Sequence, residues 1–165
     1  MTLNIKQELG KHLIFFDGGM GSLLQQNGLG AGELPELWNI THPELILKIH
    51  KDYLAAGCDI IKTNTFGANA TKFQDDQYSA QDVIRHGVAL ARRAVEESGH
   101  GLVAMDIGPT GKLMRPLGDL DFDQAYELFR EMAVTGAQAG ADVILIETMS
   151  DTYEVKAAIL AAKEN

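Results

Sequence analysis

The sequence predicts an α/β fold in which parallel β-strands alternate with α-helices. Short apolar runs recur along the chain, and longer amphipathic stretches separate them. Strands joined in this way pair in parallel through right-handed crossovers, and near-continuous apolar strands fit a sheet that is buried on both faces. The chain has 165 residues, of which 45% are hydrophobic and 22% are charged, as is typical of one globular domain. We therefore expect a single domain over residues 1–165.

The first predicted unit is a strand over residues 13–16 that ends at Asp17 and a glycine turn. Three of the next four residues are glycines, which adopt positive φ easily and let a small molecule approach the backbone. A short helix is predicted over residues 20–27, Gly28 ends it, and residues 29–34 are expected to form a loop. A strand, a carboxylate, a turn and a helix in this order are typical of a ligand site.

The second unit begins with a helix. Thr41 and Glu44 have the spacing of a capping box. Apolar residues then recur with helical spacing and are expected to form one buried face: Leu45, Ile49, Tyr53 and Ala56. A short apolar strand follows within residues 58–67, and its polar tip carries Thr63 and Thr65.

The third unit repeats the pattern. Ser79 is expected to cap a helix, and a strand over residues 102–105 runs into Asp106. The expected buried face of this helix contains Val83, Gly87, Val88, Ala91 and Val95. Residues 56–61 and 139–144 share the pattern Ala-Gly-x-Asp followed by two apolar residues, and this internal match spans two strand–helix units.

The fourth unit completes the described pattern. Asp121 is expected to cap its helix, a strand over residues 142–146 ends at Glu147, and Asp151 is expected to cap a last helix. The expected buried faces are Ala125, Leu128, Phe129, Met132 and Gly136 for the first helix, and Val155, Ile159 and Ala162 for the last.

The four strand tips are expected to meet, because ligands of parallel α/β proteins lie at the carboxyl ends of the strands. Asp17, Thr63, Asp106 and Glu147 all fall there. Asp17 and Glu147 each end an apolar run, where an ionised carboxylate is costly unless a cation or hydrogen-bond donors meet it. A bound ammonium would meet both. Helix capping or a turn is the alternative role for each acid. Thr63 and Thr65 either bind an anion or are simply β-branched residues that favour a strand.

Charge and cysteine content narrow the possible partners. The net charge of −9, without clustered Lys and Arg, argues against nucleic acid or an anionic membrane. The single Cys58 excludes an internal disulfide and is expected to be a small buried hydrophobic residue. The five histidines lack the spacing of a zinc motif, and His50 is expected on the exposed side of its helix. The residues near Met1 lack a signal-peptide pattern and no apolar run approaches about 20 residues, so we expect a cytoplasmic protein.

Five segments in order resemble the motifs of the homocysteine S-methyltransferase family: residues 17–21, 36–39, 63–69, 108–111 and 147–149. The resemblance implies the first half of a TIM (β/α)8 barrel with about four strand–helix units. It also implies that Asp17 and Glu147 hold the ammonium of homocysteine, while Gly18 and Thr63 contact its carboxylate side.

The same resemblance implies cofactors. Members of the family use a zinc ion held by three cysteines to bind the homocysteine thiolate, which attacks a methyl group. The members most similar to this chain take that group from methylcobalamin, with methyltetrahydrofolate and cobalamin bound by other modules, whereas relatives that use betaine or S-methylmethionine share the same barrel half. The zinc cysteines follow later strands, so the resemblance places them beyond Asn165, and we expect this chain alone to bind no zinc and to be inactive.

Two interpretations stay open at this point. The chain is the homocysteine-binding portion of a methyltransferase, either as part of a longer enzyme or as a natural half-barrel. Alternatively, it is a non-catalytic half-barrel that binds another small amino acid or an anion. In both, the sheet edges at residues 13–16 and 143–146 lack neighbours, and we expect another chain, most simply a second copy in a homodimer, to cover them.

Overall fold

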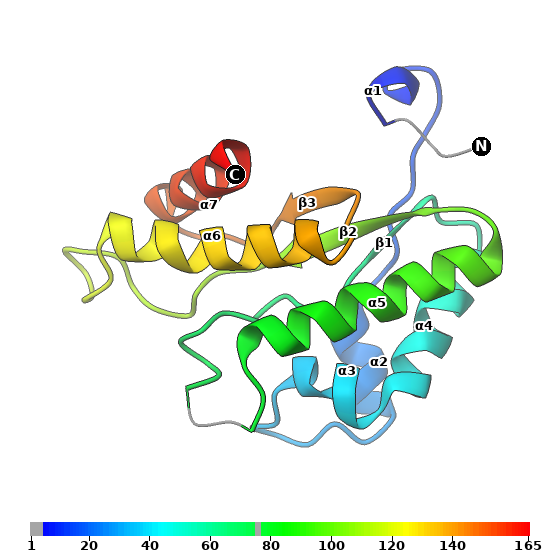
Figure 1. The fold of residues 1–165 in the computed structure, drawn as a ribbon, viewed down its shortest axis with the longest axis horizontal. Helices are drawn as coiled ribbons and strands as arrows, with labels where there is room; N and C mark the ends of the chain where they lie inside the picture. Colours follow the sequence, from blue (N-terminus) through cyan, green and yellow to red (C-terminus); the bar gives the residue numbers. More distant parts are fainter. Residues whose placement is uncertain (1–4, 75–76) are drawn as a thin grey trace.

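The computed structural model describes residues 5–74 and 77–165 and contains a three-stranded parallel sheet flanked by helices (Figure 1). The strand order is β1 (Ile60–Lys62), β2 (Leu102–Ile107) and β3 (Val143–Ile146). Ile60 pairs with Leu102 and Ala104 pairs with Val143, so the three carboxyl ends lie at one edge of the sheet. The expected α/β class with parallel pairing is confirmed.

The helices follow the strands as expected from a repeated strand–helix pattern. Their bounds are α1 (Ile5–Glu8), α2 (Met20–Gln26), η1 (Pro35–Leu37), α3 (Trp38–Thr41), α4 (Pro43–Ala55), α5 (Ala80–Ser98), α6 (Phe122–Gln138) and α7 (Thr152–Glu164). The crossover from β1 to β2 contains α5, and the crossover from β2 to β3 contains α6. In Figure 1, α4 and α5 pack together at one end of the sheet and α6 and α7 at the other. None of these helices is both long enough and apolar enough to cross a membrane.

Two of the predicted capping boxes are present. Ser79 accepts a hydrogen bond from the Asp82 N–H at the start of α5, and the Asp82 carboxylate accepts one from the Ser79 N–H. Asp121 and Gln124 form the same reciprocal pair at the start of α6. Because these bonds satisfy N–H groups that have no partner inside the helix, they fix where each helix begins.

The core lies on both faces of the sheet, since side chains of a strand alternate between faces. On one face Val103 and Met105 pack with residues of α5 and α6, including Phe129, which is fully buried. A Cβ at Gly136 would lie 2.6 Å from the Met105 side chain, so glycine is what lets α6 approach β2 this closely. On the other face a smaller cluster of Ile60, Leu102 and Ala104 is covered partly by Ile5 and Ile14.

Two aspartates fix the register between neighbouring strands. The Asp59 N–H donates to the Phe15 carbonyl (2.8 Å), while the Asp59 carboxylate accepts from the Phe15 N–H (2.9 Å). Asp142 makes the same two contacts with Val103, both at 2.8 Å. The internal sequence match between residues 56–61 and 139–144 therefore corresponds to a repeated two-point contact with the neighbouring extended segment, at Phe15 in one case and in β2 in the other.

The prediction of a strand over residues 13–16 is wrong as stated. Only Phe16 pairs, in an isolated parallel bridge with Ile60, and Leu13 and Phe15 are 75% and 55% exposed. The segment is held by β1 on one side, and no described residue covers its other side. The sheet was expected to be buried on both faces. This expectation fails at residues 13–16, which lack a covering neighbour among the described residues, and at β3, where all residues are only half-buried.

The predicted buried faces of α5 and α6 are confirmed in large part. The predicted face of α4 is confirmed for Ile49, is half-buried at Leu45 and Tyr53 and is wrong for Ala56. In α7, Val155 and Ala162 are half-buried and Ile159 is exposed.

The capping box at Thr41 does not form, because α4 starts at Pro43 with His42 before it, and the Thr41 hydroxyl donates to the carbonyl of Leu37, the last residue of η1. α4 buries Ile46, Leu47, Ile49, His50 and Leu54. α7 buries Ala157, Ala158 and Ala161, small residues that permit close packing on α6, and leaves Ile159 exposed. The short η1 and α3 were not predicted, because three or four residues show no helical period.

His50 is fully buried, which contradicts its predicted exposed position. Neither ring nitrogen has a hydrogen-bond partner among the described residues, and burial lowers the pKa of the ring from 6.5 to about 4. Because the folded pKa is lower than the unfolded one, the neutral ring is tolerated above pH 6.5, and stability falls as the pH drops towards 4.

We predict that His50→Leu removes this pH dependence. The variant should gain stability relative to the unmodified chain as the pH falls from about 7 to 5, by roughly 2 kcal/mol at pH 5. Urea unfolding at several pH values measures the difference. His86→Gln, at an exposed position of α5, is the control. If His50→Leu and the unmodified chain keep a constant stability difference across this range, the buried ring is not the acid-sensitive group.

Candidate functional site

A cavity of about 220 Å³ opens at the carboxyl ends of the strands. All four residues predicted to bind substrate, Asp17, Gly18, Thr63 and Glu147, line it together with Asp106. The remaining lining residues are Gly19, Met20, Gly21, Pro35, Glu36, Lys62, Asn64 and Phe66. The structure thus brings the predicted strand tips to one place.

Asp17 is held at the mouth of the first turn. Its N–H donates to the Ile60 carbonyl (3.0 Å), and its Oδ2 accepts from the Lys62 N–H (3.0 Å). Its Oδ1 is buried and has no hydrogen-bond partner among the described residues. Burial raises the pKa of Asp17 to about 6, although the Lys62 N–H and the charge of Lys62 oppose this shift. A donor that reached Oδ1 would stabilise the ionised carboxylate.

Glu147 directly follows β3 and faces the same cavity. Its N–H donates to the Ile107 carbonyl (3.1 Å), which extends the pairing of β3 with β2 by one residue. Its Oε1 lies 3.5 Å from Lys62 Nζ. Thr148, the next residue, has φ of 54°, in the left-handed region that a β-branched residue rarely adopts. Backbone strain of this kind is concentrated at functional sites, which fits the position of Glu147.

Asp106 and Glu36 add two more carboxylates to the cavity. Asp106 lies within β2, one residue later than the predicted strand end, and its Oδ1 is buried without a partner. Burial raises the pKa of Asp106 to about 7, and the charge of Glu147 adds to this effect. Glu36 is 4% exposed; its Oε1 accepts from the Gly67 N–H (2.6 Å), whereas its Oε2 has no partner among the described residues.

Sequence reasoning gave no role to Lys62 or Glu36. Lys62 interrupts an apolar strand at its last position, and this departure from the apolar pattern could have identified it. Glu36 lies in a motif that carries the family resemblance, but nothing in its local pattern indicates that a loop carboxylate folds back onto the tip of β1.

Thr63 lines the cavity, but its polar groups are already engaged. Its N–H donates to the Ala104 carbonyl (2.9 Å), and its hydroxyl accepts from the Asp106 N–H (3.1 Å). The Thr65 hydroxyl lies 2.6 Å from that of Thr63 and 2.8 Å from the Asp106 carbonyl. Since Thr65 has one hydroxyl hydrogen and the carbonyl can only accept, Thr63 donates to Thr65. The threonines therefore tie the tip of β1 to β2, and a contact from Thr63 to a ligand stays a prediction.

Gly18 is required by close packing as well as by its place in the cavity. A Cβ at this position would lie 2.7 Å from the Tyr53 hydroxyl oxygen. That hydroxyl donates to the Gly19 carbonyl (3.2 Å), which fixes the turn against α4. A side chain at Gly18 would therefore displace the turn that positions Asp17.

The described residues do not fit the zinc site that the family resemblance implies. They contain no group of three His, Cys, Asp or Glu side chains arranged to hold a metal ion. Cys58 is 7% exposed, and burial raises the pKa of its thiol to about 11, which disfavours the thiolate. Its predicted role as a small buried hydrophobic residue agrees with this position.

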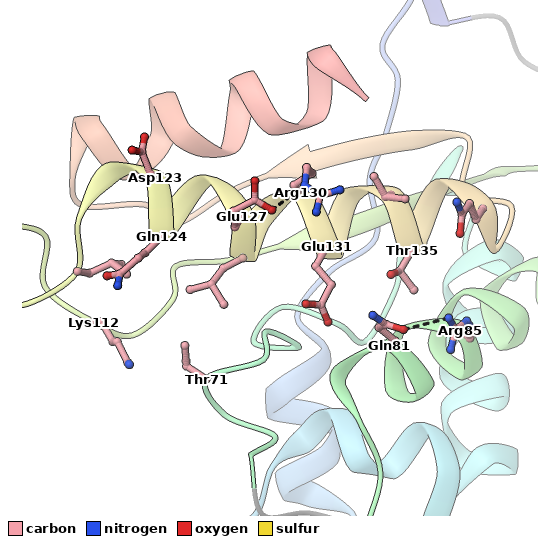
Figure 2. A pocket seen from close by; sticks show the side chains of 14 residues that line it. Thr71, Gln81, Arg85, Lys112, Asp123, Gln124, Glu127, Arg130, Glu131 and Thr135 are labelled. Carbon is pink, nitrogen blue, oxygen red and sulfur yellow. Dashed lines mark hydrogen bonds and ion pairs between the residues drawn. The ribbon is translucent and has the colours of Figure 1, made fainter.

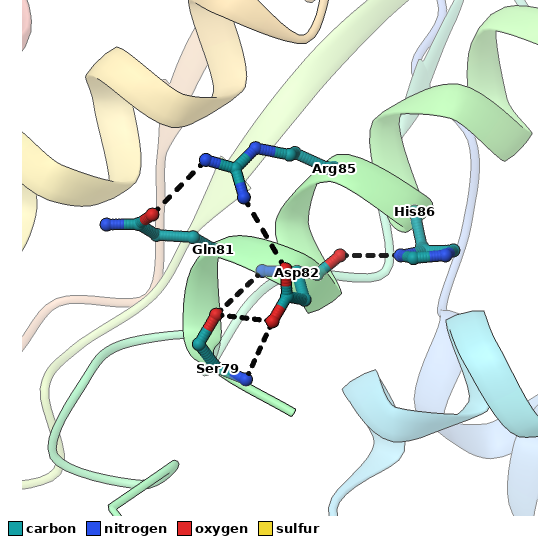
Figure 3. A network of polar contacts seen from close by, with 5 residues as sticks. All are labelled: Ser79, Gln81, Asp82, Arg85 and His86. Carbon is teal, nitrogen blue, oxygen red and sulfur yellow. Dashed lines mark hydrogen bonds and ion pairs between the residues drawn. The ribbon is translucent and has the colours of Figure 1, made fainter. Parts of the chain in front are cut away.

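A larger hollow of about 750 Å³ lies on the outer side of the molecule between α5 and α6 (Figure 2). Two pairs of its polar side chains bond to each other: Arg130 donates to Glu127 (2.8 Å) and Arg85 to Gln81 (3.2 Å). Figure 3 shows that Arg85 also reaches Asp82 in the capping network of Ser79. None of the buried unpartnered atoms of the described residues lines this hollow. The smaller cavity is the better candidate for a ligand site.

We predict that Asp106→Asn stabilises the fold at alkaline pH. The folded-state pKa of Asp106 is raised from 3.8 to about 7, so its favourable contribution is complete below pH 3.8 and is lost as the pH rises through 7. The variant should be more stable than the unmodified chain by roughly 1–3 kcal/mol at pH 8 and should lose this advantage near pH 4. Thermal unfolding at both pH values measures this, with Asp119→Asn in an exposed loop as the control. An advantage of equal size at both values would contradict the buried ionisation.

The chain is similar in sequence to known enzymes. Methionine synthase from Mycobacterium tuberculosis is 33% identical over 167 residues, which cover 94% of this chain and 14% of that protein. Methionine synthase from Mycobacterium leprae is 32% identical over 174 residues, covering 97% and 14%. The chain therefore spans only a small part of the length of these relatives.

The chain is also similar in fold to solved structures of a homocysteine methyltransferase. The metallated form of the homocysteine methyltransferase MmuM from Escherichia coli superposes with a TM-score of 0.80 at 26% sequence identity, covering 97% of this chain and 63% of that one. Its oxidized form gives a TM-score of 0.80 at 25% identity. Residues 14–165 also match the family described as homocysteine S-methyltransferase, and this match shows that the chain belongs to that family.

Proposed function

We propose that this chain is the homocysteine-binding portion of a zinc-dependent homocysteine S-methyltransferase and forms the first half of its (β/α)8 barrel. One observation carries the proposal: in a chain of this family, Asp17 and Glu147 face one cavity that also holds Asp106 and Glu36. Such a concentration of carboxylates is costly without a cation to compensate it.

The ammonium of homocysteine is the proposed cation. Three carboxylate oxygens in the cavity, from Asp17, Glu36 and Asp106, are buried and lack a partner among the described residues. An ammonium carries three N–H donors and a full positive charge, so it would satisfy such oxygens by charge-assisted hydrogen bonds. Asp17 and Glu147 are the two residues to which we assign this contact, in agreement with the family resemblance.

Gly18 is the proposed contact on the carboxylate side of the ligand, and Thr63, which the family resemblance also places there, is proposed to support this side of the cavity. The N–H groups of Gly18 and of Gly19 donate no hydrogen bond to any described residue. Thr63 has no hydroxyl hydrogen to spare, so its proposed contribution is to hold the cavity wall in place through Thr65 and Asp106.

The proposed methyl transfer requires groups that the described residues do not hold. Zinc at a cysteine site would favour the homocysteine thiolate. Methylcobalamin, with methyltetrahydrofolate as its source, is the proposed methyl donor by similarity to the methionine synthases. In this proposal the residues of this chain bind and orient the amino-acid end of homocysteine, and the zinc cysteines belong to later strands of the barrel. A cytoplasmic location stays a prediction.

A non-catalytic binding role is the second candidate. The described residues contain no metal-ligand cluster, which both candidates expect of this part of the chain, and a module that only binds an amino acid would need no zinc elsewhere either. Cysteines in later strands of the barrel would support the first candidate, and a protein without them would support the second.

We predict that Asp17→Asn and Glu147→Gln each weaken homocysteine binding by roughly 1.5–3 kcal/mol, the scale of a charge-assisted hydrogen bond. Because Asp17 protonates as the pH falls through about 6, affinity should also decline in that range, and the decline should disappear in Asp17→Asn. Titration of the chain with homocysteine, followed by NMR chemical shifts, measures both effects.

The control for this titration is Glu44→Gln, which removes a carboxylate whose side chain is 80% exposed on α4. Homocysteine affinity should be unchanged in this variant. If both cavity variants bind homocysteine as tightly as the unmodified chain does, Asp17 and Glu147 do not hold the ammonium.

We also predict that the 165-residue chain on its own contains no stoichiometric zinc, shows no methyl transfer and associates with itself. The exposed Leu13 and Phe15 lie at an unpaired sheet edge, and Ile159 adds apolar surface on α7. A second copy that covers these surfaces is the proposed partner. Metal analysis, a methyl-transfer assay and light scattering of the purified chain measure the three properties in turn.

A charged edge should weaken this association. Phe15→Lys is expected to shift the chain towards the monomer, whereas Leu117→Lys, at a position that is 81% exposed in a loop, should not. A folded monomer of the unmodified chain would contradict the edge argument. One zinc per chain would contradict the assignment of the metal to other residues.

A further inference from the structure

We propose that Lys62 selects ligands that carry a carboxylate beside their ammonium, by exchanging its ion pair with Glu147 for one with the ligand. This inference rests on the proposed function and deepens it, because it names the group that recognises the acid end of the amino acid. No role was assigned to Lys62 by the family resemblance or by the sequence pattern.

Lys62 lies between the two carboxylates that are proposed to bind the ligand ammonium. Lys62 is the last residue of β1, and it pairs with Ala104 in the register of β1 and β2. Its backbone N–H donates to Asp17 Oδ2 (3.0 Å), and its Nζ lies 3.5 Å from Glu147 Oε1. Lys62 therefore contacts both carboxylates to which we assign the ammonium of the ligand.

The cavity is strongly acidic. Four lining residues are carboxylates, namely Asp17, Glu36, Asp106 and Glu147, and Lys62 is the one cationic residue among those that line it. A ligand ammonium would meet several acceptors. A ligand carboxylate would meet repulsion from the same acids, and Lys62 is the side chain that can compensate it.

The ion pair between Lys62 and Glu147 is loose and partly exposed. A charge-assisted N–H···O bond is normally about 2.7–2.9 Å long, so the 3.5 Å separation marks a loose pair. The side chains of Lys62 and Glu147 are also 21% and 31% exposed, which leaves Nζ room to turn towards the cavity mouth. An ammonium that binds Glu147 would release Lys62, and the freed Nζ could then bind the ligand carboxylate.

Ion-pair exchange leaves both Lys62 and Glu147 with a partner of opposite charge in the free and the bound state. In the free protein Lys62 pairs with Glu147. In the bound state Glu147 pairs with the ligand ammonium and Lys62 with the ligand carboxylate. A thiol amine that lacks the carboxylate would displace Lys62 from Glu147 and leave its Nζ without a partner in a partly buried position, which is unfavourable. The exchange thus favours α-amino acids over simple amines.

The test compares homocysteine with 3-aminopropane-1-thiol, which is homocysteine without its carboxylate. Both are titrated into the 165-residue chain and followed by NMR chemical shifts. The unmodified chain should bind homocysteine about tenfold more tightly or better, as expected for a charge-assisted contact. In Lys62→Met this preference should shrink to within about twofold, whereas Lys62→Arg, which keeps the charge, should retain most of it.

Lys48→Met is the matched control, because Lys48 pairs with Asp52 on the exposed surface of α4. It should leave the preference unchanged. If Lys62→Met does not fold, Lys62→Gln, which keeps a polar end in the cavity, takes its place in the same comparison.

The outcomes separate this inference from the proposed function. If Lys62→Met weakens both ligands by the same factor and the preference persists, Lys62 only shapes the cavity and the inference is wrong, while the homocysteine site stands. Equal affinity of the unmodified chain for both ligands would also overturn it. If the unmodified chain binds neither ligand, the proposed function fails and this inference fails with it.

Discussion

Parallel backbone pairing between β1, β2 and β3 is the interaction on which the rest of the structure depends. The pairs Ile60 with Leu102 and Ala104 with Val143 place three strand ends at one edge. Side chains that are far apart in the sequence, such as Lys62 and Glu147, come within 3.5 Å of each other only because of this register. A shift of one residue would turn each of them to the other face of the sheet.

The cavity at this edge is electrostatically unfavourable for the fold, and its chemistry follows from that. Asp17 and Asp106 are buried among other carboxylates, and burial raises the pKa of both. Thr148 adds a strained backbone immediately after Glu147. Groups that lower stability but gather at one site are characteristic of a binding surface that a ligand completes, since natural proteins exchange some stability for function.

The fold class, the helix starts at Ser79 and Asp121, and the meeting of the strand tips could all be predicted from the sequence, because each depends on local pattern or on the general geometry of parallel sheets. The position of His50 could not, since the buried side of a helix depends on its neighbours and α4 is covered on more than one side. Glu36 was missed because its approach to the Gly67 N–H is a contact across 31 residues that no local spacing encodes. Residues 13–16 were predicted to form a buried strand, although Leu13, Phe15 and Phe16 are exposed, because apolar composition alone does not reveal whether a strand has a second neighbour.

The two-point contacts of Asp59 with Phe15 and of Asp142 with Val103 have a consequence for how the chain assembles. In both cases the later strand carries the aspartate and the earlier strand offers only its backbone. The units that begin at Asp59 and Asp142 therefore bring their own means of alignment and dock on a segment that precedes them in the chain, whereas β2 aligns on β1 through backbone pairing. Such a sheet can grow from the N-terminus in the order of synthesis, one unit at a time, as the chain leaves the ribosome.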